Sequence, residues 1–246
     1  MMFRHHDDVW RDFPGLAAGA LLVSDSVTAV SARSGASRSP SRPAPAPLAP
    51  DRAAEAVGRH LEAARERLAA GPEGQFPEIQ AWRRAFTALG VKPTQYRCAS
   101  ESLLRRLRRD GDLPRVHPLV DVCNAVSAAY AVPVAALDAG KIDGDLEVRY
   151  ATGDETYLTF GGEREHPAPG EITFADAAGN AHARRWTNRQ SGLSAVTVDT
   201  TTALIVTEAL HEAAAADIAR VTAALAGALG ARRVSVLTRE APRFTI

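Results

Sequence analysis

The chain has 246 residues, 46% of them hydrophobic and 24% charged, and its formal net charge is +0. This composition is typical of globular proteins with a sizeable core, and the balanced charge gives no overall field that would indicate DNA as a partner. Two cysteines, Cys98 and Cys123, provide neither a disulfide framework nor zinc-ligand spacing. The N-terminus has no signal-peptide pattern, and the longest apolar runs are too short to cross a membrane. We therefore expect a cytoplasmic protein with no membrane partner.

Apolar spacing predicts mainly helices in the N-terminal half. A strand is expected first, over GALLVSDSV (19–27), and the Pro/Ala/Ser-rich residues 31–50 are expected to form a flexible loop. Four later segments combine strong helix formers with apolar residues at three- and four-residue spacing. The predicted helices cover residues 51–69, 76–90, 100–109 and 119–130.

After Pro133 the pattern changes to short runs rich in β-branched and aromatic residues, which is typical of strands. The predicted strands are VPVAAL, LEVRYA, TYLTF, EITFAD, HARRW, SAVTV and ALIVTEAL. A helix over 211–229 and a strand over 233–237 are expected to follow. Helices first and strands second predict an α+β protein whose sheets are covered by helices on one side.

Several segments in this region resemble one protein family in their order and spacing. They are NAVS (124–127), VPVAALD, KIDGDLEVRYATGDE, TFGGE, PAPGEITFAD, RRWTNRQS and VTVDTTTALIVTEAL. Together they resemble the B3/B4 editing domain of the phenylalanyl-tRNA synthetase β chain and, more closely, free-standing proteins built around that domain. The resemblance implies a three-layer β/β/α fold and hydrolysis of the ester that joins a wrong amino acid, chiefly tyrosine, to tRNA. The sequence contains no Gly-rich phosphate loop, HExxH, GxSxG or paired CxxC motif, so no metal or cofactor is expected. The resemblance also implies that residues 51–246 form the editing domain, that residues 1–30 pack on it, and that 31–50 are a loop.

The same resemblance identifies candidate catalytic residues. Asn124 matches an asparagine on the helix beside the family's pocket, and its amide can both donate and accept hydrogen bonds. A purely structural amide bonded to a neighbouring loop is the alternative. Thr201 and Thr202 match the family's threonine-rich strand entry, where donors could hold the scissile carbonyl oxygen. The alternative for them is simple β-propensity at the start of a strand.

Candidate substrate-binding residues follow from the same comparison of motifs. Ala135 occupies the place where the bacterial synthetase domain has a histidine, so a direct copy of that site is not expected. Glu163, after Gly161 and Gly162, matches the position of an acidic residue that could bind an ammonium or a hydroxyl group. An exposed turn glutamate is the alternative for Glu163.

Arginines and a tryptophan in RRWTNR are candidate RNA contacts. Arg184, Arg185 and Arg189 suit phosphates, and Trp186 suits a stacked terminal base. A solvated surface is the alternative for these arginines. The expected partner is aminoacyl-tRNA, and the expected function is hydrolysis of mischarged aminoacyl-tRNA in trans. A non-catalytic module that binds an amino acid or an RNA end is the second hypothesis. A deep cavity that contains Asn124 and has arginines at its rim would favour the first, whereas a filled cavity would leave only a scaffold.

Overall fold

The N-terminal residues contribute one strand to each of two sheets. The computed structural model describes residues 1–24, 50–231 and 233–246. Strand β1 (Met2–His5) and helix α1 (Asp7–Asp12) precede strand β2 (Ala17–Ser24). Strand β2 is nearly all buried, as expected for an uninterrupted apolar run. The loop predicted over 31–50 lies outside the described residues except for Pro50.

The four predicted helices of the N-terminal half are all present, with ends shifted by at most two residues. Their bounds are α2 Pro50–Ala70, α3 Pro77–Ala88, α4 Ala99–Asp110 and α5 Pro118–Tyr130. A short helix that was not predicted, η2 (Glu73–Gln75), lies between α2 and α3. Local signals set the ends of two of the predicted helices. The imidazole of His117 accepts a hydrogen bond from the backbone N–H of Leu119 and caps α5, and Gly111 closes α4 in the left-handed conformation with a φ of 77°.

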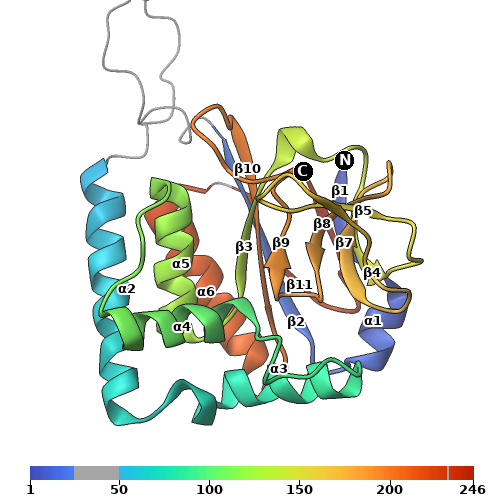
Figure 1. Cartoon of the computed structure of the whole chain (residues 1–246). Helices are drawn as coiled ribbons and strands as arrows, with labels where there is room; N and C mark the ends of the chain where they lie inside the picture. Colours follow the sequence, from blue (N-terminus) through green and yellow to red (C-terminus); the bar gives the residue numbers. More distant parts are fainter. Residues whose placement is uncertain (25–49, 232) are drawn as a thin grey trace, which may run out of the picture.

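The smaller sheet has four strands in the order β11-β2-β10-β3. Its later members are β3 Val134–Asp138, β10 Thr202–Ala209 and β11 Arg233–Leu237. Helix α6 (Ala214–Leu229) packs on β2 and β10, while α5 packs on β3, α2 and α6. Helices α5 and α6 therefore cover one face of this sheet, and α2 packs against α5 on the side away from the sheet, as Figure 1 shows.

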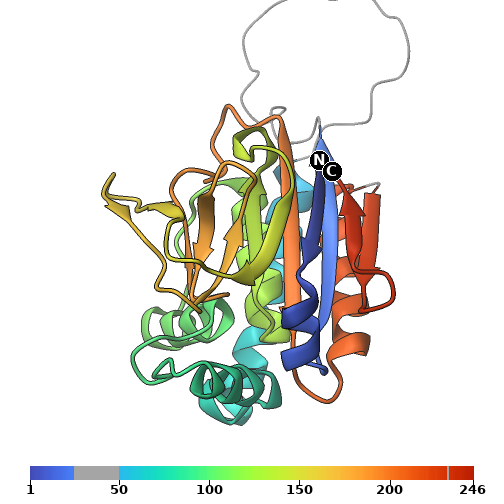
Figure 2. The ribbon, with the colours of Figure 1, turned by 90° about the vertical axis from the view of Figure 1, so that its right-hand side faces the viewer.

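The larger sheet has eight strands in the order β12-β1-β4-β7-β8-β5-β6, with β9 paired to β8. Its remaining members are β4 Leu146–Tyr150, β5 Thr156–Leu158, β6 Arg164–Glu165, β7 Ile172–Ala175, β8 Asn180–Arg184, β9 Arg189–Gln190 and β12 Arg243–Thr245. A short helix, η3 (Ala139–Lys141), leads from the smaller sheet into the larger one. The chain ends meet beside β1, where the N–H of Ile246 donates to the carbonyl of Met1 at 3.0 Å (Figure 2).

These elements form the expected three layers: helices, the four-stranded sheet and the eight-stranded sheet (Figure 1). The strand expected at the start of the chain is β2, and it is preceded by β1, which was not predicted; both lie inside the two sheets. One prediction about the elements was wrong. The segment SAVTV makes one isolated bridge, Leu137 to Ala195, and then a turn in which Val198 is exposed.

Candidate active site

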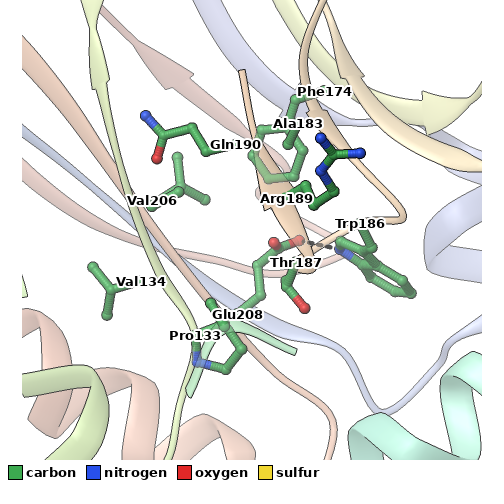
Figure 3. Close-up of a pocket in the computed structure, with 12 residues that line it drawn as sticks. Pro133, Val134, Phe174, Ala183, Trp186, Thr187, Arg189, Gln190, Val206 and Glu208 are labelled. Carbon is green, nitrogen blue, oxygen red and sulfur yellow. Dashed lines mark hydrogen bonds between the residues drawn. The ribbon is translucent and has the colours of Figure 1, made fainter. Parts of the chain in front are cut away.

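The candidate site is a cavity of about 60 Å³ between the two sheets. Strands β3 and β10 form one wall, and β7, β8 and the turn into β9 form the other (Figure 3). The lining residues are Ala99, Pro133, Val134, Ala135, Phe174, Ala183, Trp186, Thr187, Arg189, Gln190, Val206 and Glu208. Most of this surface is apolar, and the volume is enough for a few water-sized groups. The cavity therefore suits the head of a small molecule, with any larger part left outside.

Glu208 is the buried carboxyl group of this cavity, with 2% of its surface exposed. Its Oε1 atom lies 2.7 Å from Nε2 of His5 and 2.8 Å from Nε1 of Trp186. The indole N–H can only donate, so Trp186 fixes this oxygen as an acceptor. Within the described residues no donor reaches Oε2. A buried carboxylate needs partners, and this one is oriented through one oxygen while the other is left for a ligand.

A strained turn holds Trp186 in place. Arg185 and Trp186 both have left-handed backbone conformations, with φ of 46° and 57°, which residues other than glycine adopt at a cost. The ring of Trp186 packs edge-on against Trp82 at 5.0 Å and against Phe13 at 4.8 Å. Its backbone N–H donates to the carbonyl of Ile172 at 2.7 Å. The turn thus fixes the indole that orients Glu208.

Three polar residues on or beside this turn also line the cavity. The side-chain amide of Gln190 donates to the carbonyl of Ala136 at 2.8 Å and so connects the two sheets. The side chain of Arg189 is 41% exposed and extends over the Tyr157 ring. The hydroxyl of Thr187 is buried and has no hydrogen-bond partner within the described residues. Leaving such a group unpaired costs about 1–3 kcal/mol, so Thr187 is suited to bind a ligand.

Arg189 and Gln190 also line a surface hollow that adjoins the cavity. Its other residues are Tyr157, Thr159, Phe160, Gly161 and Glu163. Gly161 and Glu163, predicted as substrate-binding residues, therefore lie outside the cavity that Ala135 lines. Gly162 takes the left-handed position of the same loop, with a φ of 86°.

Two of the predicted RNA contacts need correction. Trp186 is fully buried, so its ring cannot stack on an RNA base. Arg184 is 7% exposed and forms ion pairs with Glu165 and Glu171. Burial lowers the pKa of Arg184, but the hydrogen bonds and negative charges of Glu171 and Glu165 together outweigh it, so the pKa is raised. Arg185 lies with its guanidinium 4.2 Å from the Tyr96 ring, at a different hollow.

The structure separates the predicted catalytic residues from this cavity. Asn124 is a partly exposed residue of α5, which packs on the face of the four-stranded sheet that faces away from the cavity. Thr202 begins β10, whereas Val206 of the same strand lies opposite Ala135. Four residues of strand separate them by about 13 Å, and Thr201 precedes the strand. Asn124, Thr201 and Thr202 thus do not meet at Ala135.

A cluster of possible metal ligands lies elsewhere. Glu78, His211 and Asp217 are buried and place potential ligand atoms within 4.8 Å of one another. Arg67 donates to both oxygens of Glu78, and Arg220 pairs with Asp217. Burial raises the pKa of Asp217, but hydrogen bonds from Arg220 and His211 outweigh it and lower the pKa. Because arginines already neutralise both carboxylates, we assign no metal to this cluster.

Sequence reasoning missed His5, Thr187, Gln190 and Glu208. A signal for Glu208 was present, since it is a charged residue inside the otherwise apolar and threonine-containing run ALIVTEAL. Charged residues are almost never fully buried unless paired, so such a position indicates a partner or a ligand. His5 carries no comparable signal, because its contact with Glu208 joins residues 203 positions apart in sequence.

Comparisons with known proteins agree with the resemblance seen in the motifs. The family model described as the B3/4 domain matches residues 81–227. The phenylalanine–tRNA ligase beta subunit of Shewanella oneidensis is 34% identical over 95 residues, which are 38% of this chain and 12% of that protein. This chain therefore matches only a small part of that relative's length.

A solved N-terminal fragment of the phenylalanyl-tRNA synthetase beta subunit from Pyrococcus horikoshii is also similar. It is 13% identical with a TM-score of 0.39, covering 48% of this chain and 41% of that chain. Among the described residues, no helix is long and apolar enough to cross a membrane. The cavity residues from Pro133 to Glu208 fall inside the segment matched by the family model, whereas His5 falls outside it. Because that segment covers more than half of the chain, the protein belongs to the B3/4 domain family.

Proposed function

We propose that the protein hydrolyses the ester bond of mischarged aminoacyl-tRNA in trans, with the amino-acid part bound in the cavity between the sheets. The observation that carries this proposal is the orientation of Glu208, which is fixed through Oε1 beside an otherwise apolar cavity. Membership in the B3/4 family and similarity to a segment of a tRNA ligase support tRNA as the carrier.

The cavity provides two kinds of recognition for an amino acid. The carboxylate of Glu208 accepts a hydrogen bond from the α-ammonium group or from a donor on the side chain, and such charge-assisted bonds contribute about 1.5–3 kcal/mol. Val134, Val206 and Phe174 provide apolar contacts for the carbon atoms. The volume of about 60 Å³ leaves the ribose and the base outside, on the side of Arg189 and Gln190.

Hydrolysis of this ester needs positioning more than a covalent nucleophile. A water oxygen bonds to the ester carbonyl carbon, and the bond from that carbon to the ribose oxygen breaks. The water gives up one proton, which the neighbouring ribose hydroxyl of the substrate relays to the departing ribose oxygen. The Thr187 hydroxyl is the donor in the cavity wall that has no other partner, so we assign it to the developing oxyanion.

The experiment is to incubate the purified protein with a panel of tRNAs, each charged with a cognate or a noncognate amino acid, and to follow loss of the ester. We expect faster loss from at least one mischarged tRNA than from its correctly charged counterpart. Binding of aminoacyl-tRNA without any acceleration of ester loss would contradict the proposal and favour a non-catalytic binding module.

A further inference from the structure

The aromatic side chain of Phe160 is exposed to solvent. With 74% of its surface exposed, it is the most exposed of the large apolar side chains in the described part of the chain. It lies in the hollow that shares Arg189 and Gln190 with the cavity. Exposed apolar surface costs about 25 cal/mol per Å², so such an aromatic gains free energy when a partner covers it.

The loop that carries Phe160 is held by several hydrogen bonds. The N–H of Thr159 donates to the carbonyl of Glu163 at 2.8 Å, and the N–H of Gly162 donates to the carbonyl of Thr159 at 3.1 Å. The hydroxyl of Thr159 accepts from the N–H of Glu163 at 3.0 Å. A Cβ at Gly192 would lie 3.0 Å from the Thr159 carbonyl oxygen, so the neighbouring backbone packs closely against this loop. The ring of Phe160 is therefore presented by an ordered support.

The hollow offers three kinds of group to a ligand. Phe160 gives an aromatic face and Glu163 an acceptor. Arg189 gives a partly exposed cation, whose Nη1 lies 3.3 Å from Oε2 of Glu165 and which keeps further N–H donors for a phosphate. A single-stranded nucleotide offers the complementary groups, since its base stacks on aromatic rings and its phosphate pairs with arginine. The exocyclic amine of adenine is a donor that suits a carboxylate.

We propose that Phe160 stacks on the base of the terminal adenosine of tRNA while Arg189 contacts the adjoining phosphate. The inference rests on the proposed function, in which the amino acid occupies the cavity. The ester joins that amino acid to the ribose of the last nucleotide, so the base must lie within one nucleotide of the cavity opening. The hollow of Phe160 adjoins that opening through Arg189 and Gln190. This assigns to Phe160 the stacking role that the sequence suggested for Trp186.

The test uses tRNA whose terminal adenosine is replaced by 2-aminopurine, a base whose fluorescence falls on stacking. We expect the unmodified protein to quench this signal on binding. Phe160→Ala should remove the quenching and weaken tRNA binding at least about fivefold, as expected for the loss of one base–aromatic stack. Phe160→Tyr should keep both. Val116→Ala, which shortens a side chain 70% exposed beside the helical layer, is the matched control and should change neither.

The inference is overturned if Phe160→Ala binds the tRNA as tightly as the unmodified protein, or if the unmodified protein binds without quenching. Ester loss is followed in the same samples and separates this result from the proposed function. Quenching that depends on Phe160 without ester loss from any mischarged tRNA would sink the hydrolase proposal and leave the stacking role standing. Ester loss from a mischarged tRNA that proceeds at the same rate in Phe160→Ala would leave the hydrolase proposal standing and contradict the stacking role of Phe160.

Discussion

Two residues of the cavity, Glu208 and Ala135, have different roles in the proposed chemistry. Glu208 supplies the charge, and its direction is set by His5 and Trp186 through a shared Oε1. Ala135 is important because it is small: it lies opposite Val206 on the cavity face of the sheet, and a larger side chain there would fill the space that a ligand needs. One residue gives the cavity its polarity, and the other preserves its volume.

Filling the cavity should separate activity from stability. In Ala135→Leu the added carbons occupy the cavity, so we expect deacylation to fall at least about tenfold, or about 1.4 kcal/mol in the barrier. Because Ala135 is only half-buried, the substitution should change the free energy of unfolding of the protein by no more than about 1.5 kcal/mol. Asn124→Ala, on the helical side of the sheet, is the control and should keep full activity. Rates of ester loss measure the activity of each variant, and thermal melts measure its stability. Equal activity of Ala135→Leu and Asn124→Ala would exclude this cavity as the site.

At the level of elements, β2 shows how closely the helical layer packs on the sheet. A Cβ at Gly19 would lie 2.3 Å from Cγ2 of Thr222 on α6 and 3.0 Å from Cγ2 of Thr207 on β10. No real contact is this short, so a glycine at this position lets α6 approach the sheet. By contrast, a Cβ at Gly58 on α2 would meet nothing within 4 Å.

The two glycines form a matched pair for a stability test. Gly19→Ala should lower the free energy of unfolding by about 1–3 kcal/mol, because overpacking must displace α6. Gly58→Ala should raise it by up to about 1 kcal/mol, since alanine is the better helix former. Urea unfolding of both variants measures the difference. A Gly19→Ala protein as stable as the parent would show that α6 does not pack on β2 this closely.

The periodicity of apolar residues along the sequence predicted the longer helices and strands, but not the shortest strands. Helices α2 to α5 were predicted because each combines helix formers with an apolar stripe. Strands β6 and β9 were missed because two residues carry no periodicity, and β1 and β12 are nearly as short. The cavity was harder to predict, since the contact between His5 and Glu208 depends on how the sheets stack. For the same reason Asn124 and Thr202, grouped by the family resemblance, do not line the cavity that contains Ala135.

Across the whole molecule, several ionisable groups are buried with partners. His182 is fully buried on β8, and its Nε2 lies 3.0 Å from Oδ2 of Asp176. Burial lowers the pKa of His182 below its ordinary value of 6.5, although Asp176 acts against this shift. Burial raises the pKa of Asp176, but hydrogen bonds from Asn180, the Asp143 backbone and His182 outweigh it, so the pKa of Asp176 falls below 3.8.

These shifts predict that acid destabilises the fold in two stages. With its pKa lowered in the fold, His182 takes up a proton more readily when unfolded, so the free energy of unfolding should fall as pH drops below about 6.5. The free energy of unfolding should fall a second time below pH 3.8, because the lowered pKa of Asp176 makes its carboxylate bind a proton more readily in the unfolded chain. Urea unfolding between about pH 7.5 and about pH 5 measures the first stage. His182→Gln, which keeps a donor for Asp176, should flatten that slope, and an equally steep slope in this variant would assign the effect to other groups.

The central claim is that the Glu208 carboxylate in the cavity between the sheets supports hydrolysis of an aminoacyl ester. Glu208→Gln tests it most directly, because the amide oxygen can still accept from His5 and Trp186 while the charge is lost. The measurement is the rate of ester loss from the mischarged tRNA that the unmodified protein hydrolyses fastest, with Glu66→Gln on the exposed side of α2 as the control. We expect Glu208→Gln to melt near the parent temperature but to lose at least about tenfold in kcat/KM, while Glu66→Gln keeps the full rate. A folded Glu208→Gln protein that hydrolyses this substrate as fast as Glu66→Gln would contradict the claim.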